Sequence, residues 1–263
     1  QVSALAVLPD GCRLAAGVSA DNGRVGTITV WDTGVVPPAR CATIDCGSGV
    51  WVLAVLRDGR LAAGCGDGVV RLVGVGADKG AVTTTLQGHS GLVRALALLP
   101  DGTLAGGSFD KTVLLWDVGA RACIATLAGH TERVLALAVL ADGRLASGSH
   151  DKSVRLWDVA TRACVGVLEG HTHYVRALAA LPDGRLASGS YDKTIRVWDT
   201  RPVAAAAVAR AAAIAGGGAA RATPVVVLKG HTLFVLTLAP LPGGRLASGS
   251  LDDTVRLWRL PPP

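Results

Sequence analysis

The chain has 263 residues, of which 50% are hydrophobic and 4% aromatic, and its formal net charge is +6 at pH 7. This length and apolar content suit one large domain that buries both faces of many short strands. No signal peptide is visible, and the one long run of small residues, 202–220, contains Arg210 and is too weakly hydrophobic to span a membrane.

The chain begins with an alternating apolar segment and a turn, QVSALAVLPDG at residues 1–11, which LVRALALLPDG repeats at 92–102. The phrase that follows, LAGGSFDKTVLLWD at 104–117, recurs with small changes at 145–158, 186–199 and 246–259. Each copy holds two short runs of aliphatic and β-branched residues around a turn dipeptide such as Asp192-Lys193, which predicts a β-hairpin. Because the chain contains no methionine and starts within a predicted strand, we expect it to be a piece of a longer protein.

The spacing of the repeats is regular. Trp116, Trp157 and Trp198 are 41 residues apart, and 60 residues separate Trp198 from Trp258. The Gly-His pairs that precede them have the same spacing. This period, with Gly-His early and Trp-Asp at the end, is typical of four-stranded propeller blades. Over nearly its whole length the chain resembles the WD40-repeat family, which implies an all-β fold, a β-propeller.

Six units follow in chain order. The first is divergent, and the second has Cys46 and Val73 where histidine and tryptophan are expected. The sixth supplies only three strands, so either a missing N-terminal flank closes the ring or a seventh blade has been cut away. The Ala/Gly-rich insertion at 201–224 predicts a loop, and residues 261–263 begin a Pro-rich linker. The expected blades span residues 1–40, 41–82, 83–123, 124–164, 165–224 and 225–260.

The resemblance also implies a buried hydrogen-bonded chain, a polar tetrad, in each regular blade. Its members are a histidine before the first strand, a serine on the second, the turn aspartate and the third-strand tryptophan. A structural role explains their repetition better than a catalytic triad does. The tetrads are His130, Ser147, Asp151 and Trp157; His171, Ser188, Asp192 and Trp198; and His231, Ser248, Asp252 and Trp258. The third unit has only His89, Asp110 and Trp116, because Gly106 replaces the serine.

The remaining chemistry favours neither catalysis nor metal binding. The chain lacks a phosphate-binding loop, a nucleophile elbow and a zinc-protease motif, so we expect no enzyme and no cofactor. Cys41, Cys123 and Cys164 share one repeat position, which predicts small buried residues, and the other cysteines lack metal-ligand spacing. This usage indicates a reducing setting, the cytoplasm or the nucleus.

The resemblance places ligands on the face that carries the second-to-third-strand turns. The variable positions there precede the turn aspartate or flank the first-strand valine, and they collect the two tyrosines, the two phenylalanines and the one tryptophan outside the Trp-Asp positions. Tyr, Trp and Arg are typical of binding hot spots, so we expect a protein or peptide partner, acidic or phosphorylated. The predicted residues are Trp51, Leu92, Arg94, Phe109, Arg133, Leu135, His150, Tyr174, Arg176, Tyr191, Phe234, Leu236 and Leu251.

Two other functions stay open. Trp198-Asp199-Thr200-Arg201 resembles the Trp-Asp-x-Arg box of WD40 substrate receptors that dock on cullin-RING ubiquitin ligases, here through Trp198, Asp199 and Arg201. Nucleic acid ranks lower as a partner, because the basic residues are spread over the repeats and do not follow a groove.

Overall fold

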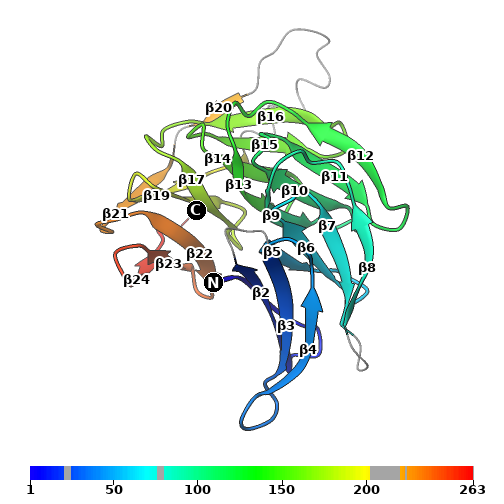
Figure 1. The fold of residues 1–263 in the computed structure, drawn as a ribbon. Coiled ribbons are helices and arrows are strands. Elements are labelled where there is room, and N and C mark those ends of the chain that lie inside the picture. Colours follow the sequence, from blue (N-terminus) through cyan, green and yellow to red (C-terminus); the bar gives the residue numbers. More distant parts are fainter. Residues whose placement is uncertain (21–24, 76–79, 202–219, 223, 263) are drawn as a thin grey trace. The chain divides into compact units, whose positions relative to one another are not determined.

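The computed structural model describes residues 1–20, 25–75, 80–201, 220–222 and 224–262. In this part of the chain the regular elements are 24 strands, which form six sheets, as the sequence predicts (Figure 1). The chain divides into two compact units, residues 1–126 and 127–263. No helix among the described residues has the length and apolar character needed to cross a membrane.

The first unit holds three four-stranded antiparallel sheets, each with its strands in chain order. The first strands of neighbouring sheets lie beside one another, β1 against β5 and β5 against β9. Aliphatic side chains fill the space between the sheets, with Leu61 and Val93 fully buried. The strands are β1 (Val2–Val7), β2 (Arg13–Ala20), β3 (Val25–Asp32), β4 (Ala39–Asp45), β5 (Val50–Val55), β6 (Leu61–Cys65), β7 (Val70–Gly74), β8 (Ala81–Leu86), β9 (Val93–Leu98), β10 (Leu104–Ser108), β11 (Val113–Asp117) and β12 (Ala122–Leu127).

The second unit repeats this arrangement, with β13 against β17 and β17 against β22. Its sheets have the orders β13-β14-β15-β16-β20, β17-β18-β19-β21 and β22-β23-β24. The strands are β13 (Val134–Val139), β14 (Leu145–Ser149), β15 (Val154–Asp158), β16 (Ala163–Leu168), β17 (Val175–Ala180), β18 (Leu186–Ser190), β19 (Thr194–Trp198), β20 (Ala220–Ala222), β21 (Val226–Lys229), β22 (Val235–Leu241), β23 (Arg245–Ser250) and β24 (Val255–Arg259).

The hairpins turn where their sequence predicts. The connection is one residue longer than the predicted dipeptide, because Tyr191, Asp192 and Lys193 together join β18 to β19, and Lys193 has a φ of 70°. Its amide donates a hydrogen bond to the Ser190 carbonyl oxygen at 3.1 Å. Lys111, Lys152 and Asp253 repeat this left-handed conformation, so one turn geometry serves four hairpins.

Of the predictions about the last sheet and the insertion, the structure confirms the first and contradicts part of the second. The last sheet has only β22, β23 and β24, which confirms the prediction of three strands within the part of the chain described. The end of the insertion, by contrast, is not a loop. Residues 220–222 form β20, which pairs parallel with β16 and extends that sheet. The predicted loop otherwise falls on residues 202–219 and 223, which lie outside the described residues.

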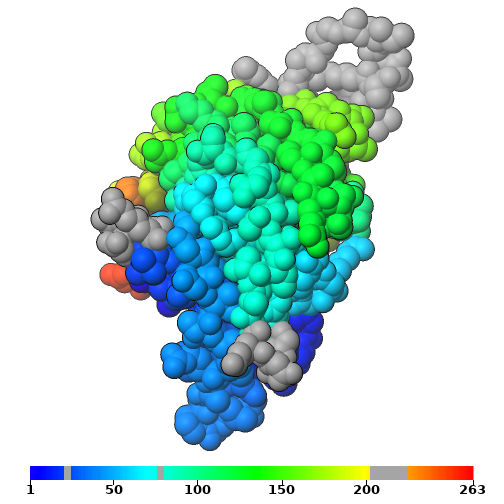
Figure 2. Space-filling view, turned by 45° about the vertical axis from the view of Figure 1, so that its right-hand side comes forward, coloured from blue at the N-terminus to red at the C-terminus, as the bar shows by residue number. Residues whose placement is uncertain are grey.

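The prediction that Cys41, Cys123 and Cys164 are buried is wrong. Cys41 and Cys123 are exposed and Cys164 is half-buried, because β4, β12 and β16 are fourth strands, far from the packed first strands. Figure 2 shows the β3–β4 hairpin that carries Cys41, in blue, as a lobe of the first unit. The buried thiols are instead Cys46 and Cys65.

Candidate functional site: an aromatic cluster carried by polar tetrads

Three sheets of the second unit contain a complete polar tetrad. In the sheet of β17–β19, His171 Nδ1 lies 2.7 Å from Asp192 Oδ2, and its Nε2 lies 2.7 Å from Ser188 Oγ. Trp198 Nε1 donates to the same Ser188 oxygen at 2.8 Å. The sets around Ser147 and Ser248 have the same contacts, at 2.7–2.9 Å. These distances bring together all twelve residues of the predicted complete tetrads.

One assignment of protons satisfies every group in such a tetrad. The indole of Trp198 can only donate, so the Ser188 oxygen accepts from it and the serine hydroxyl donates to His171 Nε2. His171 then carries its proton on Nδ1 and donates to Asp192. Since Trp198 and Ser188 are fully buried, each of these polar atoms depends on its neighbour in the chain.

The turn aspartates accept further hydrogen bonds that the sequence reasoning missed. Asp192 accepts from the Thr194 hydroxyl at 2.6 Å, from the Thr194 amide at 2.9 Å and from the Thr172 amide at 3.0 Å. Burial acts to raise the pKa of Asp192, but the hydrogen bonds from His171 and Thr194 outweigh it and hold the pKa well below its ordinary value. The sequence does contain a signal for these hydrogen bonds, because a serine or threonine stands two residues after the turn aspartate in all four regular repeats.

In the sheet of β9–β12, where Gly106 replaces the serine, backbone carbonyl oxygens take the place of the serine hydroxyl. His89 Nε2 lies 3.0 Å from the Gly106 carbonyl oxygen, and Trp116 Nε1 donates to the Gln87 carbonyl oxygen at 2.9 Å. His89 still meets Asp110 at 2.7 Å. The predicted break is therefore real, yet neither buried ring loses its hydrogen bond.

In the sheet of β5–β8, which corresponds to the second sequence repeat, a different pairing replaces the tetrad. With Cys46 and Val73 at the histidine and tryptophan positions, Arg71 turns to Asp67 and forms a bidentate ion pair at 3.0 and 2.7 Å. Burial acts to raise the pKa of Asp67, but the hydrogen bond from Arg71 and the Val69 amide lower it overall. Ser48 Oγ accepts from the Asp67 amide at 3.1 Å, as serines of β10, β14, β18 and β23 do in the regular units.

A second recurring contact ties neighbouring sheets together through an arginine that follows an Asp-Gly turn, directly in Arg144 and Arg185 and one residue later in Arg13. Arg185, 3% exposed, donates from Nη2 to Asp183 at 2.6 Å and to the Pro261 carbonyl oxygen, beyond β24, at 2.8 Å. Arg144 reaches the Thr200 carbonyl oxygen in the same way at 2.9 Å, and in the first unit Arg13 reaches that of Val75 at 2.6 Å. Each arginine thus joins one sheet to the end of a neighbouring sheet.

The tetrads and turns place the predicted face residues. In each sheet of the second unit, the residue before the turn aspartate donates its amide to the carbonyl of the residue before the first-strand valine. These pairs are His150 with Arg133 (2.9 Å), Tyr191 with Tyr174 (3.0 Å) and Leu251 with Phe234 (2.9 Å). The two variable positions of each of these three sheets are therefore adjacent at the same end of the sheet.

Across sheets, the aromatic side chains stack. His150 lies parallel to Tyr174 of the next sheet, with ring centroids 3.7 Å apart, and Tyr191 lies parallel to Phe234 of the sheet after that, at 4.2 Å. His173 is placed between them, 4.2 Å from Tyr174, 5.7 Å from Tyr191 and 6.1 Å from Phe234. We call these five half-buried side chains the aromatic cluster.

His173 was not among the predicted residues. It lies two residues before the first-strand valine, one place outside the positions considered, where other units have Gly91, Glu132 or Leu233. Its Nδ1 accepts the Tyr174 amide at 2.9 Å, so the neutral ring carries its proton on Nε2. For His150, burial lowers the pKa and nearby Arg133 lowers it further, so this ring is neutral at neutral pH.

Arg176, on β17, belongs to the same region. Burial lowers the pKa of its guanidinium, and a hydrogen bond with Tyr191 opposes this effect. The cation thus meets a phenol rather than a carboxylate.

The remaining predicted residues behave differently. In the first unit Arg94 Nη1 contacts the Trp51 carbonyl oxygen at 3.4 Å, and the Phe109 amide donates to the Leu92 carbonyl oxygen. Leu236 and Leu251 lie on the sheet of β22–β24, half-buried and exposed respectively. Leu135 is only 5% exposed, whereas the residues of the aromatic cluster are half-buried, and its place in a contact face stays a prediction.

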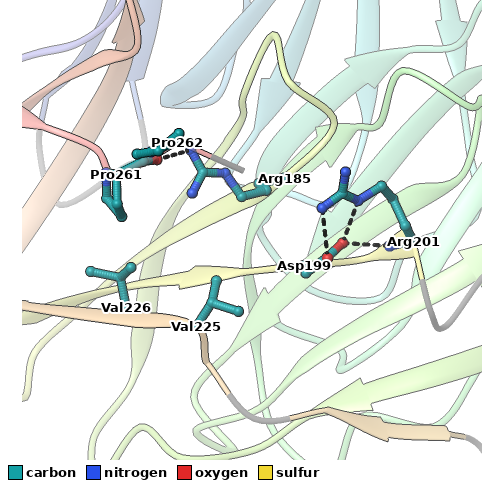
Figure 3. A pocket seen from close by; sticks show the side chains of 7 residues that line it. All are labelled: Arg185, Asp199, Arg201, Val225, Val226, Pro261 and Pro262. Atoms are coloured by element: carbon teal, nitrogen blue, oxygen red, sulfur yellow. Dashed lines mark hydrogen bonds and ion pairs between the residues drawn. The ribbon is translucent and has the colours of Figure 1, made fainter.

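The Trp198, Asp199 and Arg201 group lies at the opposite end of β19. Trp198 is fully buried, whereas Arg201 is exposed and forms two hydrogen bonds with Asp199 at 2.8 and 2.9 Å. Asp199 and Arg201 lie at a cavity of about 170 Å³. Figure 3 shows them with the other residues that line it, Arg185, Val225, Val226, Pro261 and Pro262. Within the described residues no group of three or more His, Cys, Asp or Glu side chains is arranged to hold a metal.

Repeated antiparallel sheets, four of which hold this buried polar chain or part of it, define a β-propeller built from WD-type blades. A family model described as "WD40: WD domain, G-beta repeat" matches residues 80–117, 121–158, 162–199 and 222–259, together more than half of the chain. The chain belongs to the WD40-repeat family. Domains of this family generally act as non-enzymatic scaffolds for protein interactions.

Among solved structures, the chain is similar to the computationally designed Ika8 protein. The two share 26% sequence identity with a TM-score of 0.74, over 98% of this chain and 71% of the designed one. A comparison with curated proteins found no match.

Proposed function

We propose that this protein is a non-enzymatic scaffold that binds a segment of a partner protein on the aromatic cluster, and that the segment brings an acidic or phosphorylated side chain to Arg176. The observation that carries the proposal is the pair of ring stacks, His150 on Tyr174 and Tyr191 on Phe234, which spans three sheets. Rings that are already stacked lose little conformational freedom when a partner binds.

The chemistry of the cluster supports a peptide as the ligand. Tyrosine and arginine are enriched in binding hot spots, and a guanidinium can bind a carboxylate or phosphate through two hydrogen bonds. The six cysteines are free thiols, which agrees with a protein that works in the cytoplasm or the nucleus.

A peptide array tests the proposal. Short acidic, phosphorylated and basic peptides would be screened for binding, and the affinities of those selected measured by fluorescence anisotropy. We expect acidic or phosphorylated peptides to be selected, and Tyr191→Ala or Arg176→Gln to weaken them by about 2 kcal/mol, roughly 30-fold in Kd. Val227→Ala, which alters a partly exposed side chain on β21, is the matched control.

Two results would contradict this. Selected peptides that bind equally well to the triple variant Tyr174→Ala, Tyr191→Ala, Phe234→Ala would place the contact elsewhere. Selection of basic peptides alone would remove the role given to Arg176. If the rings only filled the ends of the sheets, the triple variant would lose stability while affinity stayed unchanged.

As an alternative, we propose that the protein is a substrate receptor of a cullin-RING ubiquitin ligase, docked through Asp199 and Arg201. The supporting observation is that the exposed Arg201 guanidinium, paired with Asp199, lies beside a cavity. Arg201→Ala should abolish pulldown of a purified ligase adaptor, whereas Arg162→Ala, at another exposed arginine, should not. No adaptor binding by the unaltered protein, or binding that Arg201→Ala leaves unchanged, would end this alternative.

A further inference from the structure

Two of the six cysteines lie together in the first unit. Cys46, just before β5, and Cys65, at the end of β6, are 2% and 0% exposed, and both belong to one hydrophobic core cluster. The backbone holds the two segments side by side, because Cys65 pairs with Val50 and the Gly66 amide donates to the Gly49 carbonyl oxygen at 2.9 Å. A hydrogen bond joins the two thiols, so their sulfur atoms are in direct contact.

These cysteines stand at positions that have other tasks in the regular repeats. Cys46 occupies the position of the tetrad histidine, and Cys65 occupies that of Ser149, whose hydroxyl accepts the amide of its turn aspartate. In the sheet of β5–β8 the equivalent amide, that of Asp67, donates to Ser48 Oγ at 3.1 Å. Because Ser48 takes this hydrogen bond, the Cys65 thiol has no part in fixing the turn and interacts with Cys46.

Arg71 makes one of the two thiols the more acidic. Its guanidinium forms the ion pair with Asp67 and also a hydrogen bond with Cys65. The hydrogen bond between the thiols raises the pKa of Cys46, as burial does, and it lowers the pKa of Cys65, to which Arg71 adds. The thiolate is the nucleophilic form of cysteine, so Cys65 is the sulfur that reacts first. The Asp67 side chain is 38% exposed, so these side chains reach from the buried sulfur atoms to the surface.

We propose that Cys46 and Cys65 are a redox-sensitive pair that hydrogen peroxide converts into a disulfide. The Cys65 sulfur attacks one peroxide oxygen, so an S–O bond forms, the O–O bond breaks, and the leaving hydroxide takes up a proton to become water. The Cys46 sulfur, on losing its proton, attacks the sulfenic acid on Cys65, so an S–S bond forms and the S–O bond breaks with loss of a second water. The two sulfur atoms lose two electrons, which reduce one peroxide to two water molecules.

The disulfide joins the segment before β5 to the end of β6, in a sheet that lacks the tetrad. In the sheet of β13–β16 the histidine at the equivalent position, His130, makes this connection by hydrogen bonds to Ser147 and to Asp151. The Cys46 amide also donates to the Gly26 carbonyl oxygen on β3 at 2.9 Å, so the cross-linked segment is held to the preceding sheet as well. A cross-link that restricts the unfolded chain stabilises the folded one, so oxidation stabilises this part of the unit.

The test starts from Cys41→Ser, which removes an exposed thiol from the tryptic peptide 41–57, so that this peptide contains only Cys46. The reduced protein is treated with hydrogen peroxide, the remaining thiols are alkylated in denaturant, and the tryptic peptides are analysed by mass spectrometry without reduction. We expect peptide 41–57 to be joined to peptide 61–71, which contains only Cys65. The Tm should rise by about 5 °C or more on oxidation and return after dithiothreitol treatment.

Further variants separate the roles of the two sulfur atoms. Cys46→Ser leaves the Cys65 sulfenic acid without a partner, so dimedone should label it, whereas Cys12→Ser, at another exposed thiol, is the control and should leave the disulfide unchanged. Arg71→Gln should slow disulfide formation at least tenfold and move its pH dependence to higher pH, and Arg71→Lys, which keeps the positive charge, should retain most of the rate. Recovery of Cys46 and Cys65 both alkylated while exposed thiols are oxidised would overturn the proposal, as would a link from Cys65 to any other cysteine.

Discussion

At the scale of single residues, the serine hydroxyl is the centre of each tetrad. Ser188 Oγ accepts from Trp198 and donates to His171, so one buried oxygen satisfies two aromatic rings. The third unit manages without it only because backbone carbonyls are within reach of His89 and Trp116. The contribution of the tetrad serine to stability therefore depends on whether backbone carbonyls in its sheet could replace it.

Substitutions at Ser188 and at Gly106 compare a sheet that depends on the tetrad serine with a sheet that lacks it. Ser188→Ala leaves Trp198 Nε1 and His171 Nε2 without a partner in a buried site, so the free energy of unfolding should fall by about 1–3 kcal/mol. Gly106→Ser should not repair the third unit, because a Cβ there would lie 2.6 Å from the Trp116 ring. Urea unfolding of both variants checks this, and a stabilised Gly106→Ser protein would contradict it.

The turn aspartates make stability depend on pH. Burial acts to raise the pKa of the Asp151 carboxyl, but the hydrogen bonds from His130 and Ser153 outweigh it, so the pKa is lowered overall. The pKa values of Asp110, Asp192 and Asp252 are lowered as well. A depressed folded-state pKa gives stability that is present above the ordinary aspartate pKa of about 3.9 and lost below it. The free energy of unfolding should therefore be level above about pH 5 and fall below pH 4. Asp151→Asn should flatten this slope, and equal stability at pH 5 and pH 3 would refute the explanation.

Much at this scale could be predicted from the sequence, for a physical reason. The tetrads could be expected because the repeat resembles the WD40 family, and the donor and acceptor groups of tryptophan, serine, histidine and aspartate agree with that expectation. The pairing of Arg71 with Asp67 could not be predicted in the same way, because an arginine stands at that position in three other units and does a different task there. His173 was missed because a ring contact between sheets follows no fixed spacing along the chain.

At the scale of elements, the arginine of the Asp-Gly-Arg turn joins one sheet to the next. Arg185 is almost fully buried and bonds to Asp183 and to the Pro261 carbonyl oxygen, whereas Arg245, at the same repeat position, is exposed and donates from Nε to the Pro242 carbonyl oxygen three residues earlier. The hairpins were predictable from local turn residues. The joints between sheets were not, because their acceptors are backbone carbonyls with no signature in the sequence.

These two arginines form a matched pair for measurement. Arg185→Ala removes a buried donor from two acceptors and should lower the free energy of unfolding by about 1–3 kcal/mol. Arg245→Ala changes an exposed side chain and should shift it by no more than about 0.5 kcal/mol. Thermal unfolding followed by circular dichroism compares them, and equal losses would show that the contact with Pro261 contributes nothing.

At the scale of the whole molecule, the complete tetrads gather in the second unit. Ala16 and Ala63 stand at the serine positions of the first two sheets, and Trp31 is 37% exposed where Trp157 and Trp198 are buried. The period of the repeat predicted six sheets. It did not predict β20, because three alanine and arginine residues in a low-complexity segment carry no strand pattern.

Local stability should follow this distribution. Amides of β2 should exchange with solvent faster than the equivalent amides of β18, because the sheet of β1–β4 lacks the hydrogen-bonded chain that secures β18 to β19. Hydrogen exchange followed by mass spectrometry on the intact chain makes the comparison directly. Equal protection of the two strands would mean that apolar packing alone sets their stability.

The parallel strand β20 has a consequence for the order in which the molecule is made. A ribosome releases β16 first, then the three strands β17, β18 and β19, and only afterwards the residues that pair with β16. The outer edge of the β13–β16 sheet therefore stays open during synthesis until most of the following sheet has emerged. The fourth sheet is begun before the fifth but finished after most of it, so these two sheets mature together.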